Sequence, residues 1–153
     1  MKKVAFIFPG QGSQAVGMGK DLYENFEASK HVFDKANEVL GKDIKHICFE
    51  GDEEVLKQTV NTQPAILTTS IACLEALKSL VDVTPAYVAG HSLGEYAAYY
   101  TAGVVDLEHA LTLIQKRADL MSDAPAGSMA AVLNATDEQI KEALEKANKD
   151  GYV

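Results

Sequence analysis

Cysteines are few in this sequence, and the two that are present are widely separated. Cys48 and Cys73 form no CxxC pair and belong to no Cys/His cluster. The two stand 25 positions apart without such a motif, so neither a disulfide framework nor a zinc site is suggested, and no metal site is expected. Both cysteines are therefore expected to be reduced core residues of a cytoplasmic protein.

Basic residues are also scarce, since 14 Lys and Arg stand against 22 Asp and Glu and give a formal net charge of −8. Nucleic-acid binders that rely on a broad basic surface carry the opposite excess. The composition therefore argues against nucleic acid as a partner. It favours a role towards a small molecule or another protein.

No apolar run approaches the roughly 20 residues that a membrane-spanning helix needs. The run 4–8 follows two lysines but is too short for a signal peptide, and the segment 65–81 is interrupted by Thr, Ser, Glu and Lys. The chain of 153 residues is 47% hydrophobic, which suffices for one domain with a real core. We expect a soluble protein without membrane contact.

Three short segments have the composition of buried β-strands. Residues 4–8 are mostly β-branched or aromatic and stop at Pro9. Residues 86–89 follow Pro85 and lead into a glycine-rich pentapeptide, and residues 129–133 form a third candidate. We expect helices between these strands.

Apolar residues at helical spacing predict helices in the first half of the chain. Two helices are expected within 18–40, with a break near Ala28 and Ser29. Short helical pieces are expected over 43–49 and 52–60. A long buried helix is then expected to reach about residue 80.

Capping residues mark the start of that long helix and of two later ones. Thr62 is predicted as the N-cap of the long helix, with Pro64 in its first turn. Asp106 is predicted to cap the helix that carries the sequence QKR. Thr136 and Gln139 have the spacing of a capping box, which predicts a final amphipathic helix.

The strongest chemical signal is the G-x-S-x-G pentapeptide from Gly90 to Gly94, which lies between a predicted strand and a predicted helix. This is the context of a nucleophile elbow, in which Ser92 sits on a tight turn and projects its hydroxyl at the helix N-terminus. Glycines flank such a serine because its neighbours have no room for side chains. The backbone N–H of Leu93 is then expected to face a developing oxyanion.

Three motifs resemble one known family. FPGQGSQ at 8–14, GHSLGEY at 90–96 and Gln115-Lys116-Arg117 are similar to motifs of malonyl-CoA:acyl-carrier-protein transacylases and of the acyltransferase domains of fatty-acid and polyketide synthases. The resemblance implies an α/β fold with an α/β-hydrolase-like core of short parallel strands. It assigns residues 1–127 to the large subdomain and residues 128–153 to the start of a small ferredoxin-like subdomain.

The resemblance also implies roles for individual residues. Ser92 is expected to take malonyl from coenzyme A as an ester and pass it to the phosphopantetheine thiol of acyl carrier protein. The backbone N–H groups of Gln11 and Leu93 are expected to form the oxyanion hole. Arg117 is expected to hold the free malonyl carboxylate through a two-pronged charged hydrogen bond.

His91 and Met121 are expected to line the same acyl pocket, and no permanently bound cofactor is expected. In the family, the histidine that activates the serine lies well downstream of it. We expect the chain to lack this base and to be truncated, because 152–153 resembles a strand that begins and stops. The expected partners are malonyl-CoA and acyl carrier protein.

Other interpretations remain open at this point. The elbow also suits a serine esterase or thioesterase, which sends the acyl group to water. A fragment without a base can instead be catalytically inert and bind only coenzyme A or carrier protein. The GQGSQ segment can be a flexible polar loop. Arg117 can be a solvated residue paired with Asp119 or Asp123.

Overall fold

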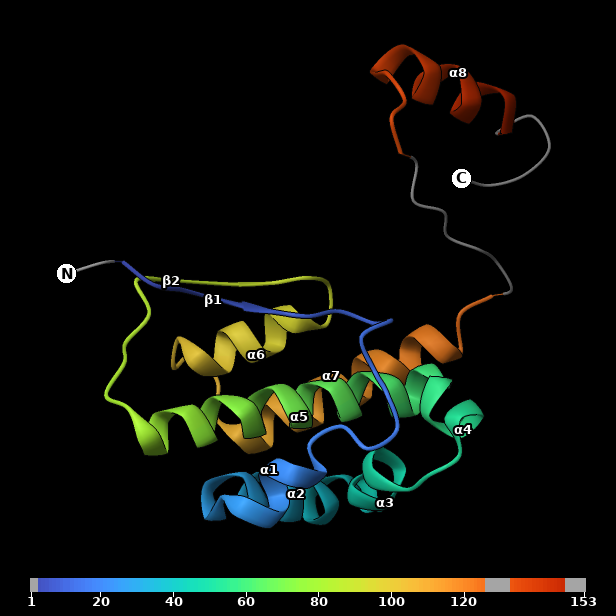
Figure 1. Cartoon of the computed structure of the whole chain (residues 1–153). Helices are drawn as coiled ribbons and strands as arrows, with labels where there is room; N and C mark the ends of the chain where they lie inside the picture. Colours follow the sequence, from blue (N-terminus) through green and yellow to red (C-terminus); the bar gives the residue numbers. More distant parts are fainter. Residues whose placement is uncertain (1–2, 126–132, 148–153) are drawn as a thin grey trace.

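The computed structural model describes residues 3–125 and 133–147, and it contains a parallel pair of strands and a set of helices. The elements in chain order are β1 (Ala5–Phe8), α1 (Lys20–Asn25), α2 (Glu27–Leu40), α3 (Ile44–Phe49), α4 (Glu53–Lys57), α5 (Thr59–Leu80), β2 (Tyr87–Gly90), α6 (Gly94–Thr101), α7 (Leu107–Ser122) and α8 (Asp137–Ala147). Figure 1 shows β1 and β2 side by side along one side of the helices α1 to α7. The first two predicted strands are confirmed.

The parallel pairing of β1 with β2 brings the two sequence motifs together. Phe8 pairs with Gly90 at the ends of the strands, so the segments that follow them begin at the same edge of the sheet. Parallel strands need a long crossover connection, and the helices α1 to α5 supply it. Along the strands, Phe8 is 7% exposed on the helix side, whereas Ile7 is 76% and Tyr87 63% exposed.

Helix α5 forms the centre of the core and packs against α2 and α7. It begins at Thr59 after the N-cap Gln58, so the predicted N-cap at Thr62 is wrong. Thr62 lies inside the helix, where its hydroxyl donates to the Leu56 carbonyl. The helix extends before Pro64 because other side chains replace the N–H that proline lacks.

The carbonyl that Pro64 leaves without a helical donor belongs to Val60, four residues earlier. This oxygen accepts from Lys42 Nζ at 2.9 Å and from Gln115 Nε2 at 3.5 Å. Lys42 lies between α2 and α3, and Gln115 lies in α7, so the start of α5 is decided by tertiary contacts. Burial lowers the pKa of Lys42, and the charge of Asp119 acts in the opposite direction.

The break between α1 and α2 lies at Phe26, whose backbone is extended, and not near Ala28 and Ser29 as predicted. Serine suggested a helix break because it competes for backbone hydrogen bonds. Here Ser29 is fully buried in α2, and its hydroxyl donates to the Ala72 carbonyl of α5 at 2.8 Å. The residue therefore joins two helices.

Replacing Ser29 by alanine is expected to lower the free energy of unfolding by about 1 kcal/mol, because a buried hydrogen bond between helices is lost. Ser79→Ala is the matched control, since Ser79 is exposed and its hydroxyl donates only within its own helix, to Ala76. Urea unfolding measures both variants. Equal losses of stability in the two variants would contradict a structural role for the bond between α2 and α5.

The other predicted caps, Asp106 and the pair Thr136 and Gln139, are confirmed. Asp106 accepts from the His109 N–H at the start of α7, and Asp43, which was not predicted as a cap, accepts from the His46 N–H at the start of α3. Thr136 and Gln139 exchange both bonds of the capping box before α8. Residues 129–132 of the third predicted strand lie outside the described residues, and Leu133 is not in a strand. The strand start expected at 152–153 also lies outside the described residues. Within the described ranges, no helix is long and apolar enough to cross a bilayer.

Candidate active site

Ser92 occupies a sharp turn between β2 and α6. Its φ of 54° lies in the left-handed region, which residues other than glycine seldom adopt. The chain reverses here from the strand that ends at Gly90 into the helix that begins at Gly94. A strained backbone of this kind marks a position that the surrounding structure holds in place.

The two glycines of the motif are required by close backbone contact. A Cβ atom on Gly90 would lie 2.0 Å from the Gly94 carbonyl carbon, and one on Gly94 would lie 2.5 Å from the Phe8 carbonyl oxygen. Both distances are far below van der Waals contact. The elbow therefore packs directly on the end of β1, which carries the other motif.

Arg117 of α7 reaches the serine. Its Nη2 donates to Ser92 Oγ at 2.9 Å, and its Nη1 donates to Gln63 Oε1 at 2.6 Å. Among the described residues, no carboxylate forms an ion pair with Arg117. Asp119, one of the alternative partners, instead accepts from Gln115 Nε2 at 2.7 Å.

Gln63 is a site residue that the sequence interpretation missed. It lies in α5 and is 0% exposed. Its Nε2 donates to Met121 Sδ at 3.2 Å, so one amide contacts both Arg117 and Met121. The sequence did offer a signal for this role, namely a glutamine inside the otherwise apolar run of α5. A buried amide needs hydrogen-bond partners, so its presence there points to polar groups nearby.

The backbone N–H groups of Gln11 and Leu93 lie at the same end of the sheet. The His91 N–H donates to the Phe8 carbonyl at 3.0 Å, which joins the elbow to the end of β1. Neither the Gln11 nor the Leu93 N–H donates to an acceptor within the part of the chain that the structure describes. Neither group is therefore committed to a hydrogen bond in those ranges.

The loop after β1 holds its own conformation through side chains. Gly12 has a φ of 104° and donates its N–H to Gln14 Oε1 at 2.8 Å. The Ser13 hydroxyl donates to the Gly10 carbonyl at 2.8 Å. These contacts favour an ordered turn around Gln11 over a merely flexible polar loop.

None of the four histidines of the sequence forms a hydrogen bond with Ser92 Oγ. His91 is exposed, and its ring packs against Gly10, where an added Cβ would lie 2.4 Å from its Nδ1. His109 Nδ1 lies 2.8 Å from its capping partner Asp106 Oδ1. The neighbouring histidine is thus a packing residue of the loop in this structure and not a base on the serine.

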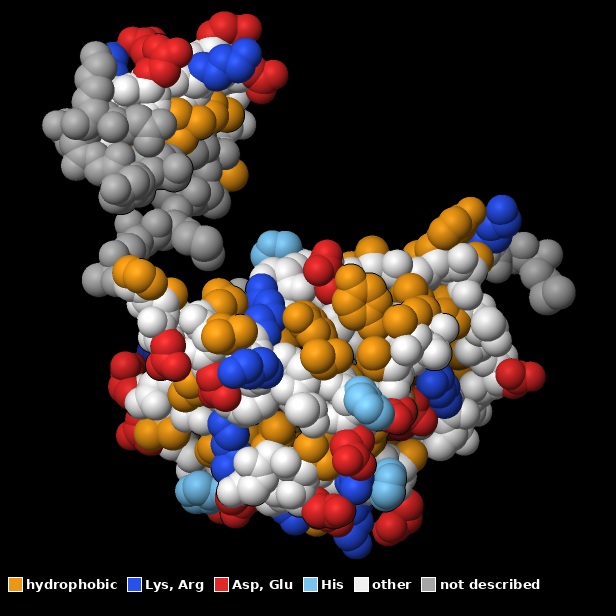
Figure 2. Space-filling model, turned by 180° about the vertical axis from the view of Figure 1, so that it is seen from behind, with side chains coloured by type: hydrophobic (Ala, Val, Ile, Leu, Met, Phe, Trp, Pro, Cys, Tyr) orange, Lys and Arg blue, Asp and Glu red, His pale blue; other side chains and the backbone are white. Residues whose placement is uncertain are grey.

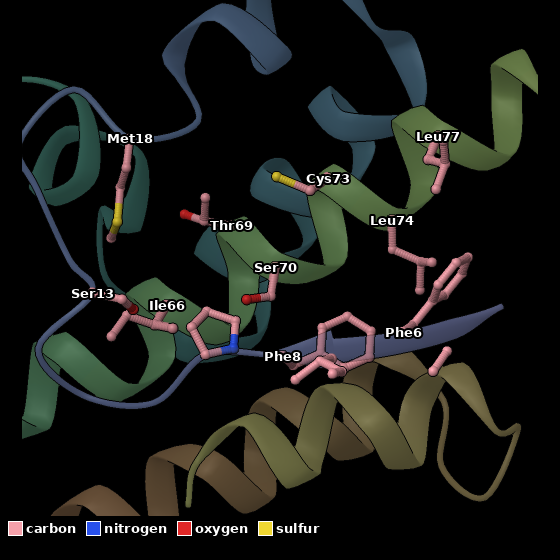
Figure 3. A pocket seen from close by; sticks show the side chains of 13 residues that line it. Phe6, Phe8, Ser13, Met18, Ile66, Thr69, Ser70, Cys73, Leu74 and Leu77 are labelled. Atoms are coloured by element: carbon pink, nitrogen blue, oxygen red, sulfur yellow. The ribbon is translucent and has the colours of Figure 1, made fainter. Parts of the chain in front are cut away.

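A groove of about 430 Å³ lies elsewhere, between β1 and α5. Figure 3 shows its apolar lining, in which Phe6 and Phe8 from β1 face Leu74 and Leu77 from α5. Ser92 and Arg117 do not line it. This groove is therefore separate from the serine and its guanidinium partner.

On the face shown in Figure 2, lysine and arginine side chains do not gather into one basic patch. Figure 2 shows acidic and basic side chains interspersed there with hydrophobic ones. The net charge of −8 agrees with this pattern. The cation at Arg117 is accordingly a local feature, placed by α7 beside the elbow.

Comparisons with known proteins give relatives over almost the whole chain. The chain is 48% identical over 154 residues to the malonyl CoA-acyl carrier protein transacylase of Bacillus subtilis (strain 168), covering 99% of this chain and 48% of that protein. It matches the structure of acyl-carrier-protein-S-malonyltransferase from Bartonella henselae with a TM-score of 0.91 and 39% identity, over 98% of this chain and 50% of that one.

A third match is a malonyl-transacylase solved in complex with a type II PKS acyl-carrier protein, with a TM-score of 0.88 and 36% identity over 99% of this chain and 50% of that one. The chain spans about half the length of the curated relatives that it matches. These structures confirm the α/β class with a short parallel sheet. The family model described as acyl transferase domain matches residues 5–150. The chain belongs to the acyl transferase domain family.

Proposed function

We propose that the protein containing this chain is an acyl-carrier-protein S-malonyltransferase of fatty-acid biosynthesis, with Ser92 as the acyl-accepting nucleophile. One observation carries the proposal: the Arg117 guanidinium lies 2.9 Å from Ser92 Oγ on the strained elbow. A permanent cation beside a nucleophile suits an acyl donor whose far end is a carboxylate. The names of the relatives point to the same donor.

The reaction has two half-steps. Ser92 Oγ attacks the thioester carbon of malonyl-CoA, the C–S bond breaks, and the coenzyme A thiol leaves with the serine proton. The phosphopantetheine thiol of acyl carrier protein then attacks the ester carbon, the bond between that carbon and Ser92 Oγ breaks, and the thiol proton returns to Ser92. The N–H groups of Gln11 and Leu93 stabilise the oxyanion in both steps, a contribution of about 3 to 4 kcal/mol for each donor.

The remaining residues shape the acyl pocket. Arg117 holds the malonyl carboxylate with its planar guanidinium, while His91 and Met121 line the sides. No permanently bound cofactor takes part, since the acyl group travels on coenzyme A, serine and the carrier arm. Residues 1–127 belong to an α/β-hydrolase-like core, and residues 128–153 begin a small ferredoxin-like subdomain.

The test of this proposal is the intact mass of the full-length protein that contains this chain, measured after incubation with malonyl-CoA. We expect an increase of one malonyl group, which peptide mapping places on Ser92. A single acylation needs no turnover, so mass detects it even when it is slow. Ser92→Ala should gain nothing, whereas Ser79→Ala, a change of an exposed serine, should gain the full adduct.

The same adduct separates transfer from hydrolysis. When acyl carrier protein with its phosphopantetheine arm is added, malonyl should leave Ser92 and be found attached to the carrier. An esterase or thioesterase would release free malonate whether or not the carrier is present. No adduct on the wild type, or one that survives Ser92→Ala, would reject the proposed function.

A further inference from the structure

Gln63 is a polar side chain in a position that otherwise favours apolar ones. It is 0% exposed, and its neighbours along α5 from Thr62 to Thr68 are all buried. A buried amide is unfavourable unless both of its ends find partners. Its retention in the core calls for an explanation in the groups that it contacts.

The orientation of the amide follows from the chemistry of its partners. A guanidinium has donors but no acceptor, so the atom 2.6 Å from Arg117 Nη1 is the carbonyl oxygen Oε1. The amide nitrogen then points to Met121 Sδ at 3.2 Å, which is a weak acceptor. Arg117 and Met121 are one turn apart on α7, so Gln63 is held by two neighbouring side chains of one helix face.

This contact fixes one side of the guanidinium and leaves its charge intact. Nη1 donates to the neutral Oε1 of Gln63, and Nη2 donates to Ser92 Oγ at 2.9 Å. Within the described ranges, the ion pairs do not include Arg117. A carboxylate at position 63 would also hold Nη1, but it would cancel the charge that an anionic acyl group needs.

We propose that Gln63 is a positioning and specificity-determining residue, which aims Arg117 at the acyl group while preserving its positive charge. This inference rests on the proposed function and deepens it. Ionised acceptors bind a guanidinium more strongly than a serine hydroxyl does. The carboxylate of malonyl therefore replaces Ser92 Oγ as the acceptor for Nη2, and Ser92 is then free to attack. Acetyl has no group that can do so.

The experiment compares the initial rates of Ser92 acylation by malonyl-CoA and acetyl-CoA, both followed by intact mass. Gln63→Met keeps the length of the side chain but removes the acceptor, and the malonyl rate should fall about 10- to 100-fold. Gln63→Glu keeps shape and acceptor but neutralises Arg117, and its malonyl rate should fall at least as far. In both variants the acetyl rate should stay within a few fold of the wild type, so the malonyl-to-acetyl ratio falls.

Thr68→Val is the matched control, since Thr68 is also 0% exposed in α5 and its hydroxyl has no partner among the described residues. It should keep the wild-type ratio. Gln63 variants that keep this ratio while the wild type is malonylated would overturn the inference alone. A wild type without any adduct would reject the proposed function instead, and if the methionine variant does not fold, the glutamate variant decides.

Discussion

Replacing Arg117 by alanine is expected to lower the rate of Ser92 malonylation by about 30-fold to several thousand-fold, while acetylation holds steady or improves. The range corresponds to the roughly 2 to 5 kcal/mol lost when one partner of a desolvated, hydrogen-bonded charge pair is removed. The guanidinium lies directly against the proposed nucleophile, with its Nη2 2.9 Å from Ser92 Oγ. Initial rates with malonyl-CoA and acetyl-CoA, followed by intact mass, measure both effects.

The two substrates should respond differently, because the same cation binds the malonyl carboxylate but is left unpaired by a neutral acetyl group. A carboxylate taken from water without a partner is strongly disfavoured, so malonyl needs Arg117. A neutral acyl group that displaces water from the guanidinium leaves that cation unpaired, and removing the cation removes this penalty. We therefore expect the selectivity between malonyl and acetyl to depend on charge and not on the size of the pocket.

Two further variants define the expected result for Arg117. Arg117→Lys should restore only part of the malonyl rate, because lysine carries a point charge without the two-pronged geometry. Lys116→Ala removes an exposed cation from the adjacent position of α7 and should change neither rate appreciably. Equal losses for malonyl and acetyl in Arg117→Ala would mean that the residue supports the fold or coenzyme A binding.

The elbow could be predicted from the sequence because its causes are local. A serine with positive φ between a strand and a helix needs neighbours without Cβ atoms, and both glycines are visible in the pentapeptide. The pairing of β1 with β2 then places the loop after Phe8 beside it. Local backbone requirements of this kind leave a signature that composition and order alone can show.

The start of α5 and the role of Gln63 could not be predicted in the same way, because distant side chains decide both. The Val60 carbonyl accepts a hydrogen bond from Lys42, which lies 18 residues earlier in the chain. Gln63 meets Arg117 across 54 positions of sequence. Such partners are known only once the helices are packed, and the general rule for N-caps then selects Thr62 wrongly.

Helix bounds show the same division between local and tertiary causes. The Asp106 cap was predictable because its acceptor and the His109 N–H are three residues apart. The break before α2 was misplaced because Ser29 satisfies its hydroxyl on Ala72 of another helix. Polar residues near a helix end are therefore ambiguous from sequence, since either a cap or a buried cross-link can satisfy them.

Gly94→Ala is expected to damage acylation more than stability. The added methyl would lie 2.5 Å from the Phe8 carbonyl oxygen and 2.7 Å from the Pro9 carbonyl oxygen. These are backbone atoms, so no side chain can rotate away, and the end of β1 must move off the elbow. Overpacking of this kind typically lowers the free energy of unfolding by about 1 to 3 kcal/mol.

The same movement is expected to displace the Gln11 N–H, which we propose as an oxyanion donor, and a shift of about 1 Å in a reacting group can lower a rate roughly 100-fold. Gly17→Ala is the matched control, because its φ of 96° opposes alanine while nothing lies within 4 Å of the added Cβ. That variant should lose stability through backbone strain but acylate Ser92 at the wild-type rate. Rates are measured well below the unfolding temperature of each variant. A Gly94→Ala protein that is folded and acylates as fast as Gly17→Ala would show that the end of β1 contributes no oxyanion donor, and the second N–H would then have to come from another segment.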